Sequence, residues 1–214
     1  MVRVTDCVRN LGVQFDAEMT MKSYVTAVCR SAIFHLRNIS RIRRYLTAAA
    51  TEQVVHAFVT SRLDIGNALL YRLPLKQTQR LQKIQNWAAR LIDGAMRYSH
   101  ATPLLKKLHW LPIAVRVEFK ILLLTHRALN GQAPDYIGHC VSRRQPVRSL
   151  RSNEHSLLCV PRTRRHWGDR AFSVAAPSLL NALPHHLTLS HMTTAAFKVK
   201  LKIYLFTRTF CTAL

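Results

Sequence analysis

The chain has 214 residues, of which 32 are Lys or Arg and 10 are Asp or Glu, so its formal net charge is +22 at pH 7. Such an excess of cations repels itself unless a polyanion neutralises it, which makes nucleic acid the expected partner. No uncharged apolar run approaches the ~20 residues that a membrane-spanning helix needs. The first twenty residues carry charges throughout, which argues against a signal peptide, so we expect a protein inside the cell, in the nucleus or the cytoplasm.

The five cysteines are an odd number, widely spread and without a pair at two-residue spacing, which favours reduced thiols over a disulfide framework. The nearest approach to a zinc-binding set is Cys140, His155, Cys159 and His166, but these spacings match no familiar Cys/His frame. Scattered histidines in a basic loop are the preferred interpretation. We therefore predict no metal site and no cofactor.

Residues 8–15 (VRNLGVQF) predict one short strand that contains a glycine. After Asp16 the pattern becomes helical, because apolar residues recur at alternating three- and four-residue steps. This predicted buried seam consists of Val25, Val28, Ala32, His35, Ile39, Ile42 and Leu46. Four cations lie away from it, namely Arg30, Arg37, Arg41 and Arg44. The pattern predicts a helix with one face in the core and one basic face.

A second helix is expected to begin after Thr47, a suitable N-cap residue, and to run through VVHAFVTSRL toward Pro74. Because this stretch is apolar nearly all round, we predict that it is the buried member of a helical bundle. Its polar residues Arg62, Asp64 and Asn67 are expected to form a local polar network.

The third helix is predicted over residues 75–92, with its core seam at Leu81, Ile84, Ala88 and Leu91. Lys76, Lys83 and Arg90 recur every seven residues on another line and form a second basic stripe. The helix has only one acidic residue, Asp93, near its end, so pairing within the helix does not account for these cations. A row of phosphates would account for them, and so would an ordinary solvated helix face.

Two further helices are predicted, a short one opened by Thr102 and Pro103 and a longer one over residues 116–130, closed by Gly131. Trp110 between them is interpreted as a packing anchor. Five helices in about 110 residues predict a helical bundle over residues 21–132.

The segment from 133 to 214 differs in character. Eight arginines lie between Arg143 and Arg170, a density that predicts a basic loop or short-strand segment. Its candidate nucleic-acid-binding residues are Arg162, Arg164 and Arg165. A terminal helix is predicted from about Thr194, with Phe197, Leu201 and Leu205 on its buried side.

The sequence offers no recognisable catalytic motif. Polymerases and nucleases hold divalent metals with clustered carboxylates, whereas the ten acidic residues here are dispersed, without a DD pair or D-x-D. Neither a phosphate-cradling glycine motif nor a G-x-S-x-G elbow occurs. We predict no catalytic residues in this chain and no enzyme activity of the chain on its own.

Nine blocks occur in a recognisable order: NLGVQFD (10–16), RNISRIRRYL (37–46), HAFVTSRLD (56–64), LQKIQNWAARLI (81–92), LHWLPI (108–113), APDYI (133–137), RSLRS (148–152), GDRAFSVAAP (168–177) and FKVKLKIYLF (197–206). Together they resemble the part downstream of the palm in reverse transcriptases of non-LTR (LINE-type, jockey-like) retrotransposons. The resemblance spans nearly the whole chain. It departs at Ile65 and Gly66, where the family usually has Tyr-Cys, and at Leu180, where it usually has Trp.

The resemblance implies a mainly α fold: a palm edge-strand remnant over 1–20, a helical thumb over 21–132 and a basic C-terminal segment with terminal helices over 133–214. In this family the catalytic aspartates lie upstream of the NLGV strand, so the resemblance implies a fragment of an RNA-directed DNA polymerase without its metal-binding half. The implied partners are RNA and DNA as a template–primer duplex, contacted along the backbone, and an upstream palm domain. We predict nucleic-acid contacts by Arg37, Arg41, Arg44, Lys76, Lys83 and Arg90. A domesticated structural or protein-interaction module without a polymerase role is the alternative.

Overall fold

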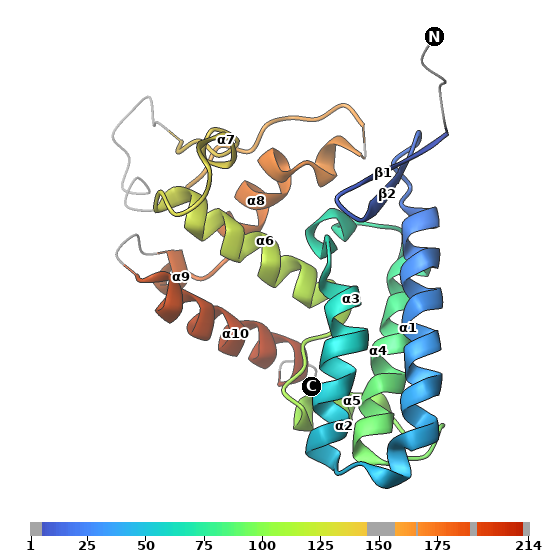
Figure 1. The fold of residues 1–214 in the computed structure, drawn as a ribbon. Coiled ribbons are helices and arrows are strands. Elements are labelled where there is room, and N and C mark those ends of the chain that lie inside the picture. The colour runs from blue at the N-terminus through green and yellow to red at the C-terminus, as the bar shows by residue number, and fades with distance from the viewer. Residues whose placement is uncertain (1–5, 145–156, 166, 189–191, 212–214) are drawn as a thin grey trace. The chain divides into compact units, whose positions relative to one another are not determined.

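The computed structural model describes residues 6–144, 157–165, 167–188 and 192–211. Its described part is mainly helical with one N-terminal two-stranded hairpin, which confirms the predicted mainly α class (Figure 1). The chain divides into two compact units, Met1–Ala114 and Val115–Leu214, called the N-terminal and C-terminal units below. No helix in the described ranges is long and apolar enough to cross a membrane.

The N-terminal strand prediction is wrong in one respect, because residues 8–15 form two strands and not one. β1 (Cys7–Asn10) pairs antiparallel with β2 (Val13–Asp16), and Asn10 lies opposite Val13. Leu11 and Gly12 make the turn with φ of 47° and 86°. A two-residue hairpin turn with two positive φ values matches the right-handed twist of the strands, and glycine adopts such a φ without a steric cost.

The hairpin packs against Gly66, which lies between α3 and η3. Gly66 has φ +59°, and a Cβ added there would lie 2.9 Å from Val13 Cγ2. Val13 is buried, whereas every residue of β1 is exposed. Next to this contact the Tyr24 hydroxyl donates to the carbonyl oxygen of Ile65 at 2.5 Å. Packing at this corner is therefore close because residue 66 has no side chain.

α1 (Lys22–Ile42) continues into the short 3-10 turn η1 (Arg43–Tyr45). Its buried side chains are Tyr24, Val25, Cys29, Ala32, Leu36 and Ile39. The predicted seam was right at Val25, Ala32 and Ile39, but it left out Cys29 and Leu36 and included the exposed Ile42. The buried face is turned by part of a helical turn from the predicted one. Apolar spacing alone does not fix which side of a wide apolar stripe meets its neighbours.

α2 (Ala48–Val55) begins as predicted, since the Thr47 hydroxyl oxygen accepts from the amide of Ala50 at 3.2 Å. The chain continues through one π-helical turn, η2 (His56–Thr60), into α3 (Ser61–Asp64). This stretch was predicted to be the buried member of the bundle, but it is buried on one side only. One face, with Val55, Val59 and Leu63, is buried, whereas Phe58 is exposed on the other.

The predicted polar network after this helix forms in part. In η3 (Asn67–Leu70), the side-chain amide of Asn67 donates to an Asp64 carboxylate oxygen at 3.3 Å. Arg62 is instead exposed; burial lowers the pKa of His35, and the charge of Arg62 lowers it further. The predicted network thus forms between Asp64 and Asn67.

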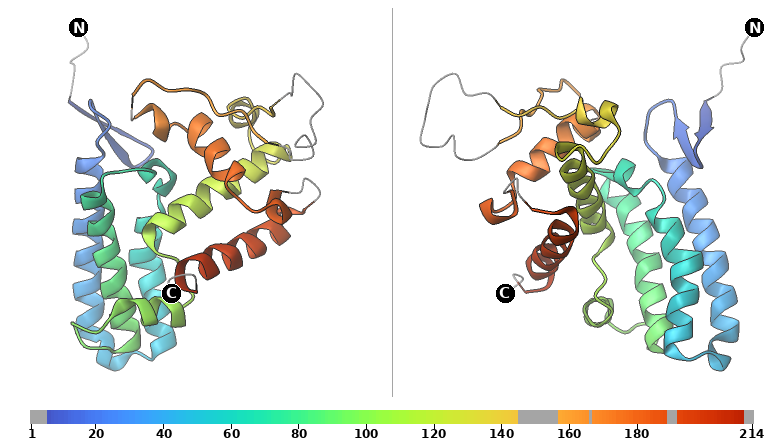
Figure 2. Two further views of the ribbon diagram at one scale, coloured as in Figure 1. Left: turned by 180° about the vertical axis from the view of Figure 1, so that it is seen from behind. Right: turned by 60° about the vertical axis from the view of Figure 1, so that its left-hand side comes forward.

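α4 (Leu75–Asp93) and α5 (Ala101–Lys107) complete the helices that lie wholly in the N-terminal unit. Figure 2 shows α1, α2 and α4 side by side from two further directions. Leu81, Ile84 and Ala88 are buried as predicted, but Ile92 replaces Leu91 in the core. Trp110 is buried with its ring edge-on to His56 at 5.3 Å, which confirms it as a packing anchor.

The C-terminal unit contains most of α6 (Ile113–Leu129), and then α7 (Asp135–Gly138), the 3-10 turn η5 (Gly168–Arg170), α8 (Phe172–Asn181), α9 (His185–Thr188) and α10 (Thr194–Phe210). The prediction for α10 is confirmed, because its residues Phe197, Leu201 and Leu205 are fully buried. Between α7 and η5, Arg143 and Leu158 form an isolated antiparallel bridge. The Asn181 side chain fixes Leu158 by donating to its carbonyl and accepting from its amide, both at 2.9 Å.

Candidate nucleic-acid interface

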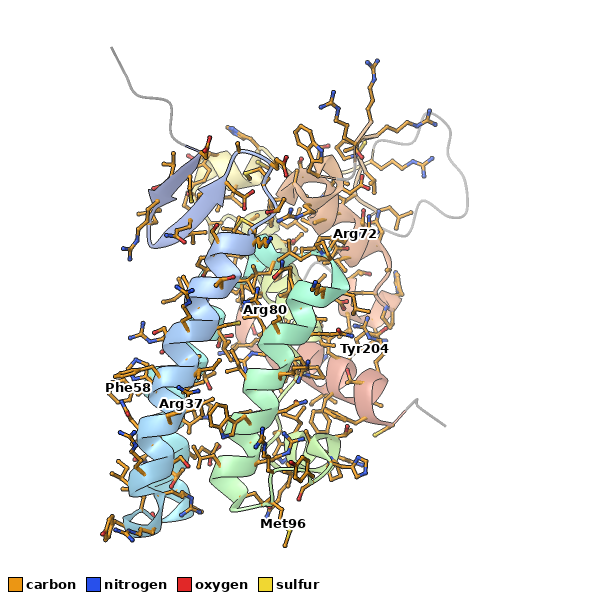
Figure 3. All side chains as sticks on the ribbon, turned by 90° about the vertical axis from the view of Figure 1, so that its right-hand side faces the viewer. Arg37, Phe58, Arg72, Arg80, Met96 and Tyr204 are labelled. Atoms are coloured by element: carbon orange, nitrogen blue, oxygen red, sulfur yellow. The ribbon has the colours of Figure 1, made fainter. Side chains whose placement is uncertain are left out.

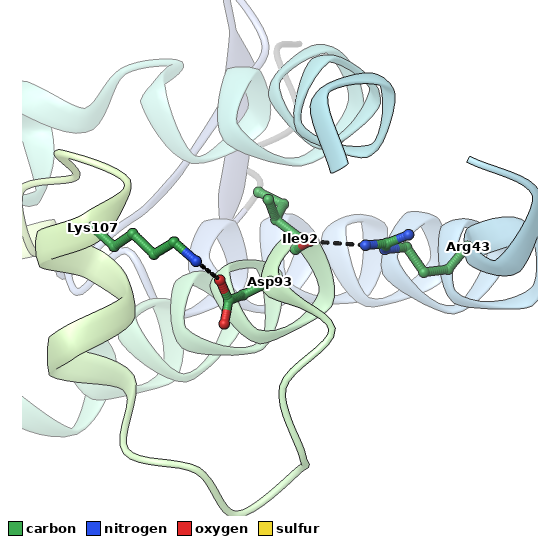
Figure 4. Close-up of polar contacts among 4 residues, drawn as sticks. All are labelled: Arg43, Ile92, Asp93 and Lys107. Carbon is green, nitrogen blue, oxygen red and sulfur yellow. Dashed lines mark hydrogen bonds and ion pairs between the residues drawn. The ribbon is translucent and has the colours of Figure 1, made fainter. Parts of the chain in front are cut away.

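α1 and α4 lie side by side and are joined near both ends by arginine side chains. Near their first turns, Arg80 Nη1 donates to Thr26 Oγ1 at 3.1 Å. At their C-terminal ends, Arg43 of η1 donates from Nε to the Leu91 carbonyl at 2.9 Å. Its Nη2 donates to the Ile92 carbonyl at 3.0 Å (Figure 4). The N-terminal part of α1 thus contacts the N-terminal part of α4, and their C-terminal ends contact each other, so the two helices run parallel.

The two predicted basic stripes meet along this pair of helices. Arg80 marks the edge of α4 that faces α1, and Lys76 and Lys83 lie four residues before it and three after it, on the same side of the helix. Thr26 marks the facing edge of α1, and Arg30 lies one turn further along it. Arg37 and Arg41 continue that line. Figure 3 views this side of the unit and labels Arg37 and Arg80.

We call this surface the α1–α4 basic face. It consists of Arg30, Arg37, Arg41, Lys76, Arg80 and Lys83. All are exposed except Arg80, which is half-buried. α1 contains no acidic residue, and the Asp93 carboxylate of α4 pairs with Lys107 Nζ at 2.5 Å (Figure 4). The cations of the face are therefore not neutralised by carboxylates of their own helices.

Two predicted contact residues are placed differently. Arg44 is exposed in η1, with its guanidinium carbon 4.7 Å from the centre of the Tyr45 ring. Arg90 is half-buried, and its Nε donates to the carbonyl of Ser99 at 2.8 Å. Arg90 thus holds the loop after α4, so at least part of its guanidinium has a structural task.

The sequence-based set left out Arg30 and Arg80, which the structure adds to the face. A signal for both was present, because Arg30 lies seven residues before Arg37 and Arg80 lies three before Lys83. Cys29, buried beside Arg80, is not a candidate nucleophile. Burial raises the pKa of its thiol, and the positive charge of Arg80 lowers it by a smaller amount. The protonated thiol is therefore favoured near neutral pH.

Arg43 differs from the residues of the basic face, because each of its three guanidinium nitrogens donates to a backbone carbonyl. The acceptors are the carbonyls of Leu91 and Ile92, at the C-terminal end of α4, and of Leu46. A cation that hydrogen-bonds the last carbonyls of a helix stabilises its end. We expect Arg43→Gln to lower the free energy of unfolding by about 1–3 kcal/mol, because buried or half-buried carbonyls then lose charged donors.

The matched control for Arg43 is Arg44→Gln, which removes the same charge from the next residue and is expected to change stability by less than about 0.5 kcal/mol. Urea denaturation of both variants measures the difference. Equal effects of the two substitutions would contradict the structural role of Arg43.

Arg162, Arg164 and Arg165 are exposed in the C-terminal unit and form a separate candidate. The guanidinium carbon of Arg165 lies 5.2 Å from the centre of the exposed Trp167 ring. The Thr163 hydroxyl donates to the Asp169 carboxylate, which brings the two ends of this segment together. Of the eight arginines in this region, Arg148 and Arg151 lie outside the described residues.

Within the described ranges, no three His, Cys, Asp or Glu side chains are grouped so that they could hold a metal ion. His155 and His166 of the weighed zinc-binding set lie outside those ranges. Comparison of the chain with protein-family models, with curated proteins and with solved structures finds no match. The assignment of a function therefore depends on the geometry above and on the residues that carry the family resemblance.

Proposed function

We propose that this chain binds the phosphate backbone of nucleic acid, as the thumb and basic C-terminal part of a non-LTR retrotransposon reverse transcriptase. The observation that carries the proposal is the α1–α4 basic face, on which two parallel helices present six cations without a carboxylate from α1. In this proposal the partners are RNA and DNA as a template–primer duplex, together with an upstream palm domain in the full-length element. The chain contributes no catalytic step and needs no cofactor.

The length of the face suits a polyanion better than a small anionic ligand. From Arg30 to Arg41 the α1 row extends over eleven residue-to-residue steps, or about 16 Å of helix. Duplex DNA carries one negative charge for about every 1.7 Å of its axis, both strands counted, so a duplex segment of this length contains on the order of ten phosphates. Cations spread along such a row fix the position of a backbone without reading base sequence.

The sequence blocks that resemble retrotransposon reverse transcriptases also favour the α1–α4 basic face as the binding surface. Two of its blocks, 37–46 and 81–92, fall on the C-terminal part of α1 with η1 and on α4, the two helices that make the face. The basic residues of these blocks include Arg37, Arg41 and Lys83 of the face, as well as Arg43, which joins the two helices. The blocks therefore contain both a set of backbone-binding residues and a residue that holds them in place.

The proposal is tested with three triple-glutamine variants of the full chain, each of which removes three positive charges. The first changes Arg37, Lys76 and Lys83 of the basic face, and the second changes Arg162, Arg164 and Arg165. The control changes Lys198, Lys200 and Lys202, which are exposed on α10. Affinity for duplexes of several sequences is measured as a function of salt concentration.

We expect the basic-face variant to weaken binding to all duplexes alike and to reduce the slope of log K against log salt by about 2.7, at 0.9 for each of three lost phosphate contacts on B-form DNA. The control should leave the slope nearly unchanged. If only the second variant reduces the slope, the basic segment of the C-terminal unit is the binding element. Weak binding that does not respond to salt would instead favour the protein-interaction alternative.

A further inference from the structure

An aromatic ring lies within the cationic row of α1. Arg30, Phe34, Arg37 and Arg41 follow one another at steps of four, three and four residues, so they lie along one side of the helix. All four are exposed, and the Phe34 side chain is 61% exposed. Phe34 therefore does not belong to the core of the described fold, and its ring is presented to solvent between guanidinium groups.

Phe34 is joined to a second exposed ring through a histidine. The His35 ring meets Phe34 edge to face, with centroids 5.4 Å apart, and stacks on Phe58 with centroids 5.3 Å apart and 25° between the planes. Phe58 is 47% exposed and comes from the π-helical turn η2. In Figure 3, Phe58 projects at the outer edge of α1, at the level of Arg37. Isolated π-helical turns are frequent at functional sites.

The charges near these rings indicate which kind of partner they can bind. Arg62 from α3 lies close enough to His35 to act on its charge, and burial together with Arg62 lowers the pKa of this histidine. His35 is therefore neutral near pH 7 and offers an uncharged aromatic ring. Besides Arg62, three exposed arginines lie in the same row of α1 as Phe34, namely Arg30, Arg37 and Arg41, so a suitable partner combines negative charge with flat apolar groups.

We propose that Phe34, His35 and Phe58 form a base-stacking platform for unpaired nucleotides, whose phosphates are held by the four surrounding arginines. This inference rests on the proposed function and extends it from the duplex backbone to the bases of a single strand. Aromatic rings beside a basic groove bind single strands because every base has a face that stacks, so the platform needs no particular sequence. A second protein is the less suitable occupant, since it would have to bring carboxylates to four guanidinium groups.

The test uses the full chain and two single-stranded ligands of equal length and equal phosphate number, a twelve-nucleotide oligothymidylate and an abasic oligonucleotide. The variant Phe34→Ala/Phe58→Ala removes both exposed rings, and Phe34→Leu/Phe58→Leu removes them but keeps apolar volume. Tyr98→Ala/Tyr136→Ala is the matched control, because it removes two exposed aromatic side chains outside the platform. Thermal melting verifies that each variant is folded.

We expect both Phe variants to bind oligothymidylate about 5- to 150-fold more weakly for each stacked base that is lost. Their affinity for the abasic ligand and their salt slopes should stay as in the unchanged chain, as should all values for the tyrosine control. An equal loss on both ligands, or no loss on either, overturns the platform while backbone binding stands. Full recovery in the Leu variant also overturns it and indicates an apolar docking face for protein. Absence of binding to both ligands and to duplexes refutes the proposed function as well.

Discussion

Phe197→Ala is expected to lower the free energy of unfolding of the C-terminal unit by about 3–5 kcal/mol. The side chain is 0% exposed, and its ring stacks on the imidazole of His126 with centroids 4.1 Å apart and 11° between the planes. His126 lies on α6 and Phe197 on α10, so the stack joins the two long helices of this unit. Truncation removes the ring and leaves a cavity beside a buried imidazole. Since small domains are stable by only about 5–15 kcal/mol, this loss is a large part of the total.

The control for Phe197 is Val199→Ala on the same helix, where the side chain is 58% exposed and a change below about 0.5 kcal/mol is expected. Urea denaturation of the full chain measures both variants. Similar small effects would show that α10 is not packed through Phe197.

The same stack sets a dependence on pH. Burial lowers the pKa of His126 below its usual 6.5, so at acid pH the unfolded chain binds a proton that the folded chain binds less readily. The contribution of His126 to stability is therefore largest above pH 6.5, where both states are neutral, and it falls as pH decreases below that value. Because Phe197→Ala opens His126 to water, the loss of stability between pH 7 and pH 5 should be smaller in this variant.

Leu81→Ala is expected to lower the free energy of unfolding of the N-terminal unit by about 2–5 kcal/mol. Leu81 lies on the buried side of α4 and is 2% exposed. It directly follows Arg80, the residue that joins α4 to Thr26 of α1, so a cavity at this position weakens the packing that holds the α1–α4 basic face together. The cost depends on how far α1 and α4 close over the missing volume.

Leu75→Ala is a matched control, because it makes the same chemical change at the first residue of the same helix, where the side chain is 71% exposed. We expect it to change stability by less than about 0.5 kcal/mol. Amide hydrogen exchange of α1 and α4 in the two variants measures the difference locally. Unchanged protection of both helices in Leu81→Ala would contradict the assigned core.

Several elements could be predicted from the sequence because their causes are local. The hydroxyl oxygen of Thr47 caps α2 by accepting a hydrogen bond from the amide of Ala50, three residues later in the chain. Gly131, with a positive φ, follows the end of α6. The spacing of Phe197, Leu201 and Leu205 places these residues on one side of α10 whatever lies against it. Capping and helical periodicity act within one or two turns, so the residues of the segment itself determine them.

The candidate interface was predictable in the same way, but only within each helix. The seven-residue spacing placed Arg30 and Arg37 on one line of α1 and Lys76 and Lys83 on one line of α4. That these lines adjoin depends on the contacts of Arg80 with Thr26 and of Arg43 with Leu91 and Ile92. Such contacts join residues about fifty positions apart, and no local spacing encodes them.

Sequence alone thus determined the longer helices α1, α4, α6 and α10, the caps at Thr47 and Gly131, the excess of positive charge and the existence of two basic stripes, because propensity, capping and composition are properties of short segments. Only the tertiary structure decided that Arg43 and Arg90 bind carbonyls while Arg37 and Lys83 are exposed, and that Phe58 is exposed while Leu36 is buried. The physical reason is that the role of an arginine or a phenylalanine depends on which atoms surround it. Those atoms come from other segments, whose positions are fixed only when the helices pack.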